Sequence, residues 1–113
     1  MSRFADVLER LAATIAARKA ADAATSYTAQ LLNDPERAAK KLGEEAIETV
    51  IAVLGPNKDA LAAESADLIY HWLVVLAAAG VSLDDVAAKL EAREGTSGLA
   101  EKASRSSPGA QRE

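Results

Sequence analysis

The sequence of 113 residues contains no cysteine, a single histidine and only 4% aromatic residues. The lack of cysteine excludes a disulfide framework and thiol chemistry. Positive charge is also scarce, since 13 Lys and Arg stand against 17 Asp and Glu. We therefore expect no nucleic-acid partner, because such surfaces usually need a basic stripe. A phosphorylated substrate stays compatible with this charge, because a bound cation can supply the attraction.

Long hydrophobic runs are absent as well. The longest run, Leu68 to Val81, contains His71 and falls short of the roughly 20 residues that span a bilayer. The N-terminal stretch MSRFADVLERL has acids inside its apolar pattern, unlike the continuous apolar segment of a secretory signal. We expect a cytoplasmic protein with no membrane partner.

The residues that are abundant favour helices. Half of the chain is apolar, mostly Ala, Leu and Val, and Ala and Leu lose little free energy in a helix. The length suits one domain. From Thr96 the composition changes to Ser, Gly and charged residues, so we expect a folded domain over residues 1–95 and a flexible tail over 96–113.

Start and stop signals predict the helices and their ends. Apolar spacing places the first helix from about Arg3 to Arg18 or Lys19. The remaining boundaries follow from capping residues: Thr25 or Ser26 before a short helix ending at Leu32, Asp34 before Pro35–Leu54, Asn57 before a helix ending at Ala79 with Gly80 behind it, and Ser82 before a helix ending near Glu94. No strand pattern appears. The predicted fold is all-α, an antiparallel bundle of about four to five helices.

The stretch KKLGEEAIETV, residues 40–50, places three carboxylates close together on one predicted helix. In a helical projection Glu44, Glu45 and Glu48 share one half of the circumference, and Lys41 joins them one turn earlier. The opposite half is apolar: Ala46, Ile47, Val50, Ile51, Val53 and Leu54. Taken alone, this acidic face is compatible with ordinary solvated ion pairs worth a few tenths of a kcal/mol.

The next helix argues for more than solvation. Glu64 and Asp67 share a face at the start of its apolar run, and no polar stripe interrupts residues 68–79. A helix that is apolar all round is expected to be buried, so its acids need partners. A short connection makes the two helices antiparallel neighbours, which brings Glu48 level with Glu64 and Glu45 level with Asp67. Four carboxylates at one level predict a Mg²⁺ site, with Mn²⁺ as the alternative.

The same apolar helix predicts self-association. A domain of about 95 residues has too little material to cover one helix on every side. Packing between two copies would cover it, so we expect a homodimer that completes the bundle.

These motifs closely resemble a known family. KKLGEEAIETVIAVL followed by ESADLIYHWLVVLAAAGVSLDDV, with SYTAQLL ahead of them, is similar to the phosphoribosyl-ATP pyrophosphatases of histidine biosynthesis. The wider group is the all-α, MazG-like nucleotide pyrophosphohydrolases, whose E-E-x-x-E and E-x-x-D signature stands here intact. The resemblance implies a Mg²⁺-dependent hydrolase that converts phosphoribosyl-ATP to phosphoribosyl-AMP and pyrophosphate, the second step of the pathway. It implies these metal ligands: Glu45, Glu48, Glu64 and Asp67.

Other residues have two interpretations each. Glu44 could act as the catalytic base or hold a second metal ion. Lys40 and Lys41 could contact substrate phosphates, with Lys41 also a catalytic candidate, or could only pair with neighbouring acids. Arg37 is a further candidate for phosphate contact.

The segment Ser26, Tyr27 and Thr28 could offer hydroxyls or a stacking ring to the nucleotide, or could serve capping and packing. His71 lies one turn after Asp67 and could orient that carboxylate, or be a satisfied core histidine.

Two other functions stay open at this point. One is a related enzyme that hydrolyses free or noncanonical nucleoside triphosphates, because the metal motif would be the same. The other is a non-catalytic helical dimerisation module, which explains poorly why Glu64 and Asp67 stand on so apolar a helix.

Overall fold

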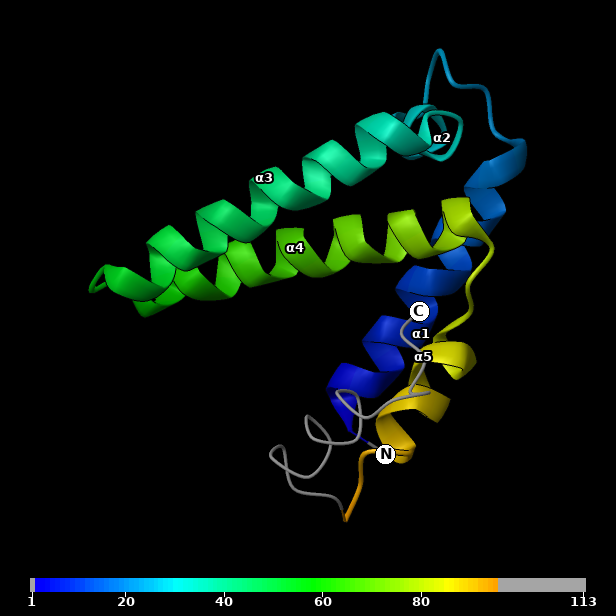
Figure 1. The fold of residues 1–113 in the computed structure, drawn as a ribbon. Coiled ribbons are helices and arrows are strands. Elements are labelled where there is room, and N and C mark those ends of the chain that lie inside the picture. The colour runs from blue at the N-terminus through cyan, green and yellow to red at the C-terminus, as the bar shows by residue number, and fades with distance from the viewer. Residues whose placement is uncertain (1, 96–113) are drawn as a thin grey trace, which may run out of the picture. The chain divides into compact units, whose positions relative to one another are not determined.

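A computed structural model describes residues 2–95, so the predicted tail at 96–113 lies outside the described residues. Its elements are α1 (Arg3–Ala17), the 3₁₀ helix η1 (Arg18–Ala20), α2 (Tyr27–Leu32), α3 (Pro35–Leu54), α4 (Lys58–Ala79) and α5 (Leu83–Glu91), shown in Figure 1. No strand occurs in residues 2–95. The all-α prediction is confirmed.

The helices begin where side chains can cap them. Ser26 Oγ accepts from the Ala29 amide at 3.1 Å, which selects Ser26 over Thr25 as the cap of α2. Asp34 and Asn57 cap α3 and α4 in the same way. Gly80 ends α4 with φ of 75°, a left-handed conformation that glycine adopts most easily.

Helix α5 begins as predicted but ends earlier than predicted. Ser82 and Asp85 form the reciprocal capping box, with bonds of 2.9 and 3.0 Å. The helix ends at Glu91 rather than near Glu94. Beyond it the amides of Arg93 and Glu94 bond three residues back instead of four, so the last turn is no longer α-helical.

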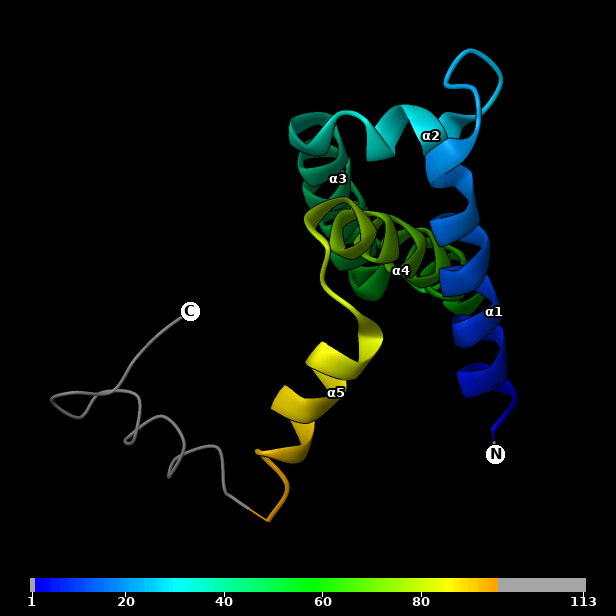
Figure 2. The same ribbon diagram turned by 90° about the vertical axis from the view of Figure 1, so that its right-hand side faces the viewer.

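The chain divides into two compact units, Met1–Val81 and Ser82–Glu113. In the first unit α3 and α4 run antiparallel and side by side, joined by residues 55–57 (Figures 1 and 2). Helix α2 packs against both of them, and α1 packs against α4. The predicted boundary near residue 95 stays a prediction.

The core of the first unit gathers at the junction of its four helices. Every buried hydrophobic residue there is at most 3% exposed: Ile15, Ala29, Leu31, Ala38, Leu73 and Val74. These residues fall in the last part of α1, in α2, near the start of α3 and in the second half of α4.

Burial of α4 within a single chain is only partial. His71, Leu73 and Val74 are its buried residues, so one chain by itself does not bury the helix on every side. The reason is the small size of the domain, since α1, α2 and α3 cannot surround a helix of 22 residues. By length and composition alone α4 could also cross a membrane, but the core helix of a soluble protein passes the same test.

Candidate metal centre and active site

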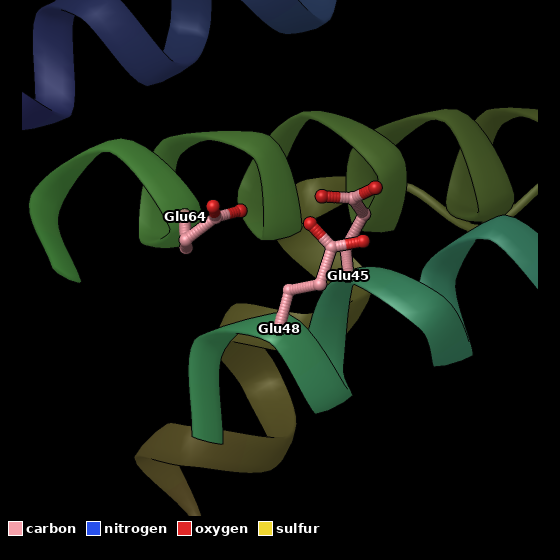
Figure 3. Close-up of side chains that lie close together, drawn as sticks. All are labelled: Glu45, Glu48 and Glu64. Atoms are coloured by element: carbon pink, nitrogen blue, oxygen red, sulfur yellow. The ribbon is translucent and has the colours of Figure 1, made fainter. Parts of the chain in front are cut away.

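Three carboxylates converge between α3 and α4. Glu45 and Glu48 extend from α3 and Glu64 from α4, and their side chains lie together between the two helices (Figure 3). Each offers an oxygen, and the three oxygens lie within 4.8 Å of one another. Glu45 is only 7% exposed, Glu64 is half-buried and Glu48 is exposed. The antiparallel hairpin thus produces the predicted meeting of acids from two helices.

A threonine fixes the register at this level. The Thr49 hydroxyl lies 2.8 Å from the Glu45 carbonyl on its own helix and 3.3 Å from the Glu64 carbonyl on α4. A bond between the helices next to the cluster limits sliding of α3 along α4. The carboxylates are therefore held at matching heights by the backbone around them.

Glu64 occupies an environment that opposes its charge. Its Oε1 is buried and has no hydrogen-bond partner among the described residues. Burial raises the pKa of Glu64 above its ordinary value, and the charges of Glu48, Asp67 and Glu45 raise it further. An oxygen without a donor, beside other anionic oxygens, suits a hard divalent cation. The donor set therefore fits Mg²⁺ or Mn²⁺.

Asp67, the fourth predicted ligand, is not brought into this group. It lies one turn after Glu64 on α4 and is exposed. It is still close enough for its charge to contribute to the raised pKa of Glu64. Its role as a ligand stays a prediction.

Lys41 is a basic residue that contacts the carboxylate cluster. Its Nζ lies 3.3 Å from Glu44 Oε1 and 3.9 Å from Glu45 Oε2. The hydrogen bond to Glu44 raises the pKa of Lys41, with a smaller contribution from Tyr27. The structure therefore shows the ion pairing foreseen for Lys41, and it links Glu44 to the edge of the carboxylate cluster. Lys40 is exposed.

The start of α2 is bonded to α4 by side chains. Tyr27 Oη lies 3.3 Å from His71 Nε2, and the Thr28 hydroxyl bonds that of Tyr70. The Arg37 guanidinium stands 5.8 Å from the centre of the Tyr27 ring, within the range of a cation–π contact. Sequence reasoning did not single out Tyr70; its signal was a hydroxyl beside a histidine in an otherwise aliphatic run.

His71 does not orient the carboxylate of Asp67. Its Nδ1 bonds the backbone carbonyl of Asp67 at 2.8 Å, and the residue is 7% exposed. The interpretation as a partner of that carboxylate is wrong, because an i to i−4 bond along the helix already uses this nitrogen. His71 is a buried histidine with both ring nitrogens bonded.

Comparison with known proteins gives a consistent identification. The chain matches the family described as phosphoribosyl-ATP pyrophosphohydrolase over residues 8–94. It is 74% identical over 103 residues to the phosphoribosyl-ATP pyrophosphatase of Caulobacter vibrioides (strain NA1000 / CB15N), covering 91% of this chain and 96% of the relative. It is 70% identical to that of Caulobacter sp. (strain K31), covering 95% and 100%. For that of Cereibacter sphaeroides (strain KD131 / KCTC 12085) identity is 57%, covering 88% and 97%.

Fold and relatives together define an all-α hydrolase. Within that class, the chain belongs to the phosphoribosyl-ATP pyrophosphohydrolase family. The resemblance found in the sequence motifs is confirmed.

Proposed function

We propose that this protein hydrolyses phosphoribosyl-ATP to phosphoribosyl-AMP and pyrophosphate with Mg²⁺, as the second step of histidine biosynthesis in the cytoplasm. One structural observation carries the chemistry: Glu45, Glu48 and Glu64 offer oxygens within 4.8 Å of one another between α3 and α4. The substrate follows from the family and from the names of its close relatives.

The proposed ligands are the three clustered glutamates, joined by Asp67. When bound there, Mg²⁺ neutralises charge on the substrate's phosphate oxygens, and Mn²⁺ is the alternative ion. The buried oxygen of Glu64, which has no donor among the described residues, supports a cation at this point. The Thr49 hydroxyl lies within hydrogen-bond distance of the carbonyls of both Glu45 and Glu64, which supports the pairing of these ligand-bearing turns.

The remaining proposed roles concern water and substrate. Hydrolysis needs a water placed in line with the leaving pyrophosphate. Glu44, at the edge of the cluster and paired with Lys41, is proposed to orient or deprotonate that water, or to hold a second metal ion. Lys40, Lys41 and Arg37 are proposed to contact the phosphates.

The hydroxyl segment before and in α2 is proposed to contact the nucleotide. Tyr27 is 42% exposed, so its ring remains accessible to a ligand. Ser26 already uses its oxygen to cap α2 and the Thr28 hydroxyl bonds that of Tyr70, which leaves the exposed ring of Tyr27 as the better supported contact of the three.

A homodimer is proposed as the working unit. Five large apolar side chains on α3 are between 57% and 82% exposed in the single chain: Ile47, Val50, Ile51, Val53 and Leu54. A contiguous apolar face of this kind is unusual on a monomer. Packing against a second copy would bury this face. The partial cover of α4 in the single chain also favours a second copy.

The direct test is pyrophosphate release from phosphoribosyl-ATP, measured with Mg²⁺ and with a chelator. We expect rapid, Mg²⁺-dependent release, and much slower release from dCTP and dUTP. Preference for the free nucleoside triphosphates would favour the related enzyme instead. Absence of release from all three, together with a melting temperature that Mg²⁺ does not raise, would favour a non-catalytic dimerisation module.

A further inference from the structure

Two neighbouring residues of α2 bond two neighbouring residues of α4. Tyr27 pairs with His71 and Thr28 pairs with Tyr70. The pairs join the start of α2 to α4 one turn beyond Asp67. They also lie beside the core, because His71 is only 7% exposed while Tyr27 is 42% exposed. The buried His71 therefore restrains the partly exposed Tyr27 through a hydrogen bond.

The geometry of His71 decides which atom donates in this contact. Its Nδ1 lies 2.8 Å from the Asp67 carbonyl, and a carbonyl oxygen can only accept, so Nδ1 carries the hydrogen. In the neutral ring Nε2 is then an acceptor, and the Tyr27 hydroxyl must donate to it. The Tyr70 ring packs edge-on at 4.9 Å, which further restrains the imidazole.

This bond fixes where Tyr27 presents its oxygen and its ring. With the hydroxyl hydrogen committed to His71, the hydroxyl oxygen can act only as an acceptor toward other groups. One side of the ring faces the Arg37 guanidinium at 5.8 Å. The bond to His71 thus sets the position of Tyr27 beside the Arg37 guanidinium.

We infer that His71 is a positioning residue, which through Tyr27 holds the Arg37 side of the site ready for the phosphates of the nucleotide. The inference rests on the proposed function for its kinetic consequence. His71 acts through Tyr27, because both its ring nitrogens are engaged within the protein and its ring is buried. Loss of its Nε2 acceptor frees Tyr27 to rotate and weakens substrate binding more than it slows the chemical step.

The kinetic test uses two variants of His71, each of which replaces a different nitrogen of the imidazole ring. His71→Asn keeps an amide at the level of Nδ1 and removes the Nε2 acceptor, whereas His71→Gln places an amide at the level of Nε2. We expect His71→Asn to raise KM for phosphoribosyl-ATP about threefold to tenfold, as for one lost hydrogen bond, with kcat little changed. His71→Gln should restore most of the lost affinity.

A second background tests whether His71 works through Tyr27. In the Tyr27→Phe protein the hydroxyl is already absent, so adding His71→Asn should raise KM no further. An equal rise in both backgrounds would overturn the inference, because it would show that His71 acts through the fold in general. Circular dichroism confirms that each variant is folded before its kinetics are compared.

A spectroscopic test needs no substrate. His71 is the only histidine in the chain, so its imidazole nitrogens can be assigned in a long-range ¹H–¹⁵N spectrum. We expect the Nδ1–H tautomer, and a shift of the Nε2 resonance in Tyr27→Phe. The matched control is Tyr70→Phe, which keeps the packed ring and should leave that resonance in place. An Nε2–H tautomer, or an unmoved Nε2 resonance in Tyr27→Phe, would contradict the inference.

The kinetic and spectroscopic tests together separate failure of this inference from failure of the proposed function. If the wild-type protein released no pyrophosphate from phosphoribosyl-ATP, the proposed function would fail while the tautomer result still stood. If the wild-type enzyme were active but His71→Asn kept the wild-type KM, the positioning role alone would fail. Should His71→Asn not fold, Tyr27→Phe and the imidazole spectrum still decide.

Discussion

Within the carboxylate cluster, the surroundings of Glu64 oppose the ionisation of its side chain. Its neighbours Glu45 and Glu48 cannot balance its charge, and one of its oxygens is buried without a donor among the described residues. Burial is the first cause of its raised pKa, and the adjacent carboxylates add to it. Metal binding and protonation are therefore competing ways of stabilising the same oxygen.

The metal-free protein should lose stability as the pH rises through the raised pKa of Glu64. A raised pKa in the folded state means that the stabilising proton is fully bound below 4.5, the ordinary value, and is released above the shifted value. Glu64→Gln should remove this pH dependence and raise the metal-free melting temperature at pH 7. Melts over a pH series, with a chelator, measure both effects.

The matched control for that experiment is Glu9→Gln, an exposed acid on α1. It should follow the wild-type pH dependence. In Glu64→Gln the Mg²⁺-induced rise in melting temperature should also disappear. A metal-free Glu64→Gln protein that melts below the wild type at pH 7 would contradict the argument that the fold disfavours the ionised form of this carboxylate.

Loss of a ligand from α3 should abolish turnover without unfolding the helices. Glu45→Gln and Glu48→Gln keep side-chain size but remove an anionic oxygen from the cluster. We expect a fall in kcat beyond the roughly tenfold to hundredfold typical of groups that only orient a ligand. Pyrophosphate release at saturating Mg²⁺ measures it, and far-ultraviolet circular dichroism checks the fold.

Glu9→Gln again serves as the control and should keep wild-type kcat. Normal turnover in both α3 variants would mean that the convergence of these carboxylates is incidental to the reaction.

Among the elements, α4 depends on one glycine at its end, whereas α3 tolerates a glycine within it. Gly80 adopts φ of 75°, and an added Cβ there meets nothing within 4 Å. Gly43 lies within α3 and is equally uncrowded. The two positions therefore differ mainly in backbone conformation.

Gly80→Ala should lower the free energy of unfolding by roughly 1 kcal/mol, the usual cost of a left-handed L residue. Gly43→Ala should raise it by about 0.5–1 kcal/mol, because alanine loses less entropy inside a helix. Urea unfolding at one fixed protein concentration measures both. Equal stability of Gly80→Ala and the wild type would refute the conformational argument.

For the molecule as a whole, the exposed apolar face of α3 predicts that two chains associate. The face includes Ile51 at 63% and Leu54 at 82% exposure. Light scattering at micromolar concentration should give the mass of two chains. Ile51→Glu should shift the mass toward one chain and lower the melting temperature, because a charge would then have to be buried in the contact.

The control for this test is Ala87→Glu, which adds the same charge at an exposed position of α5 and should stay dimeric. A monomeric mass for the wild-type protein would exclude the proposed dimer.

Much of the fold could be predicted because helix ends depend on short-range contacts. Ser26, Asp34, Asn57 and Ser82 each bond an amide three residues ahead, so the signal for each helix start lies within a few residues. The end of α5 was predicted less well. A gradual change from α-helical to 3₁₀ bonding at Arg93 and Glu94 leaves little trace in residue type.

The candidate site was predictable only in part. The one-turn spacing of Glu45 and Glu48, and the short α3–α4 connection, sufficed to predict their meeting with Glu64. The position of Asp67 outside the group depends on the rotation of α4 about its own axis, which spacing does not give. The same is true of the side of α3 that is left uncovered.

By itself, the sequence determined the helices, their caps and the faces that carry the acids, because 3.6-residue periodicity and capping bonds act locally along the chain. Only the tertiary structure decided which oxygens converge, that His71 bonds a carbonyl and Tyr27, and which apolar face of α3 stays open. These features depend on the register and rotation of one helix against another, which arise from contacts between residues far apart in the chain.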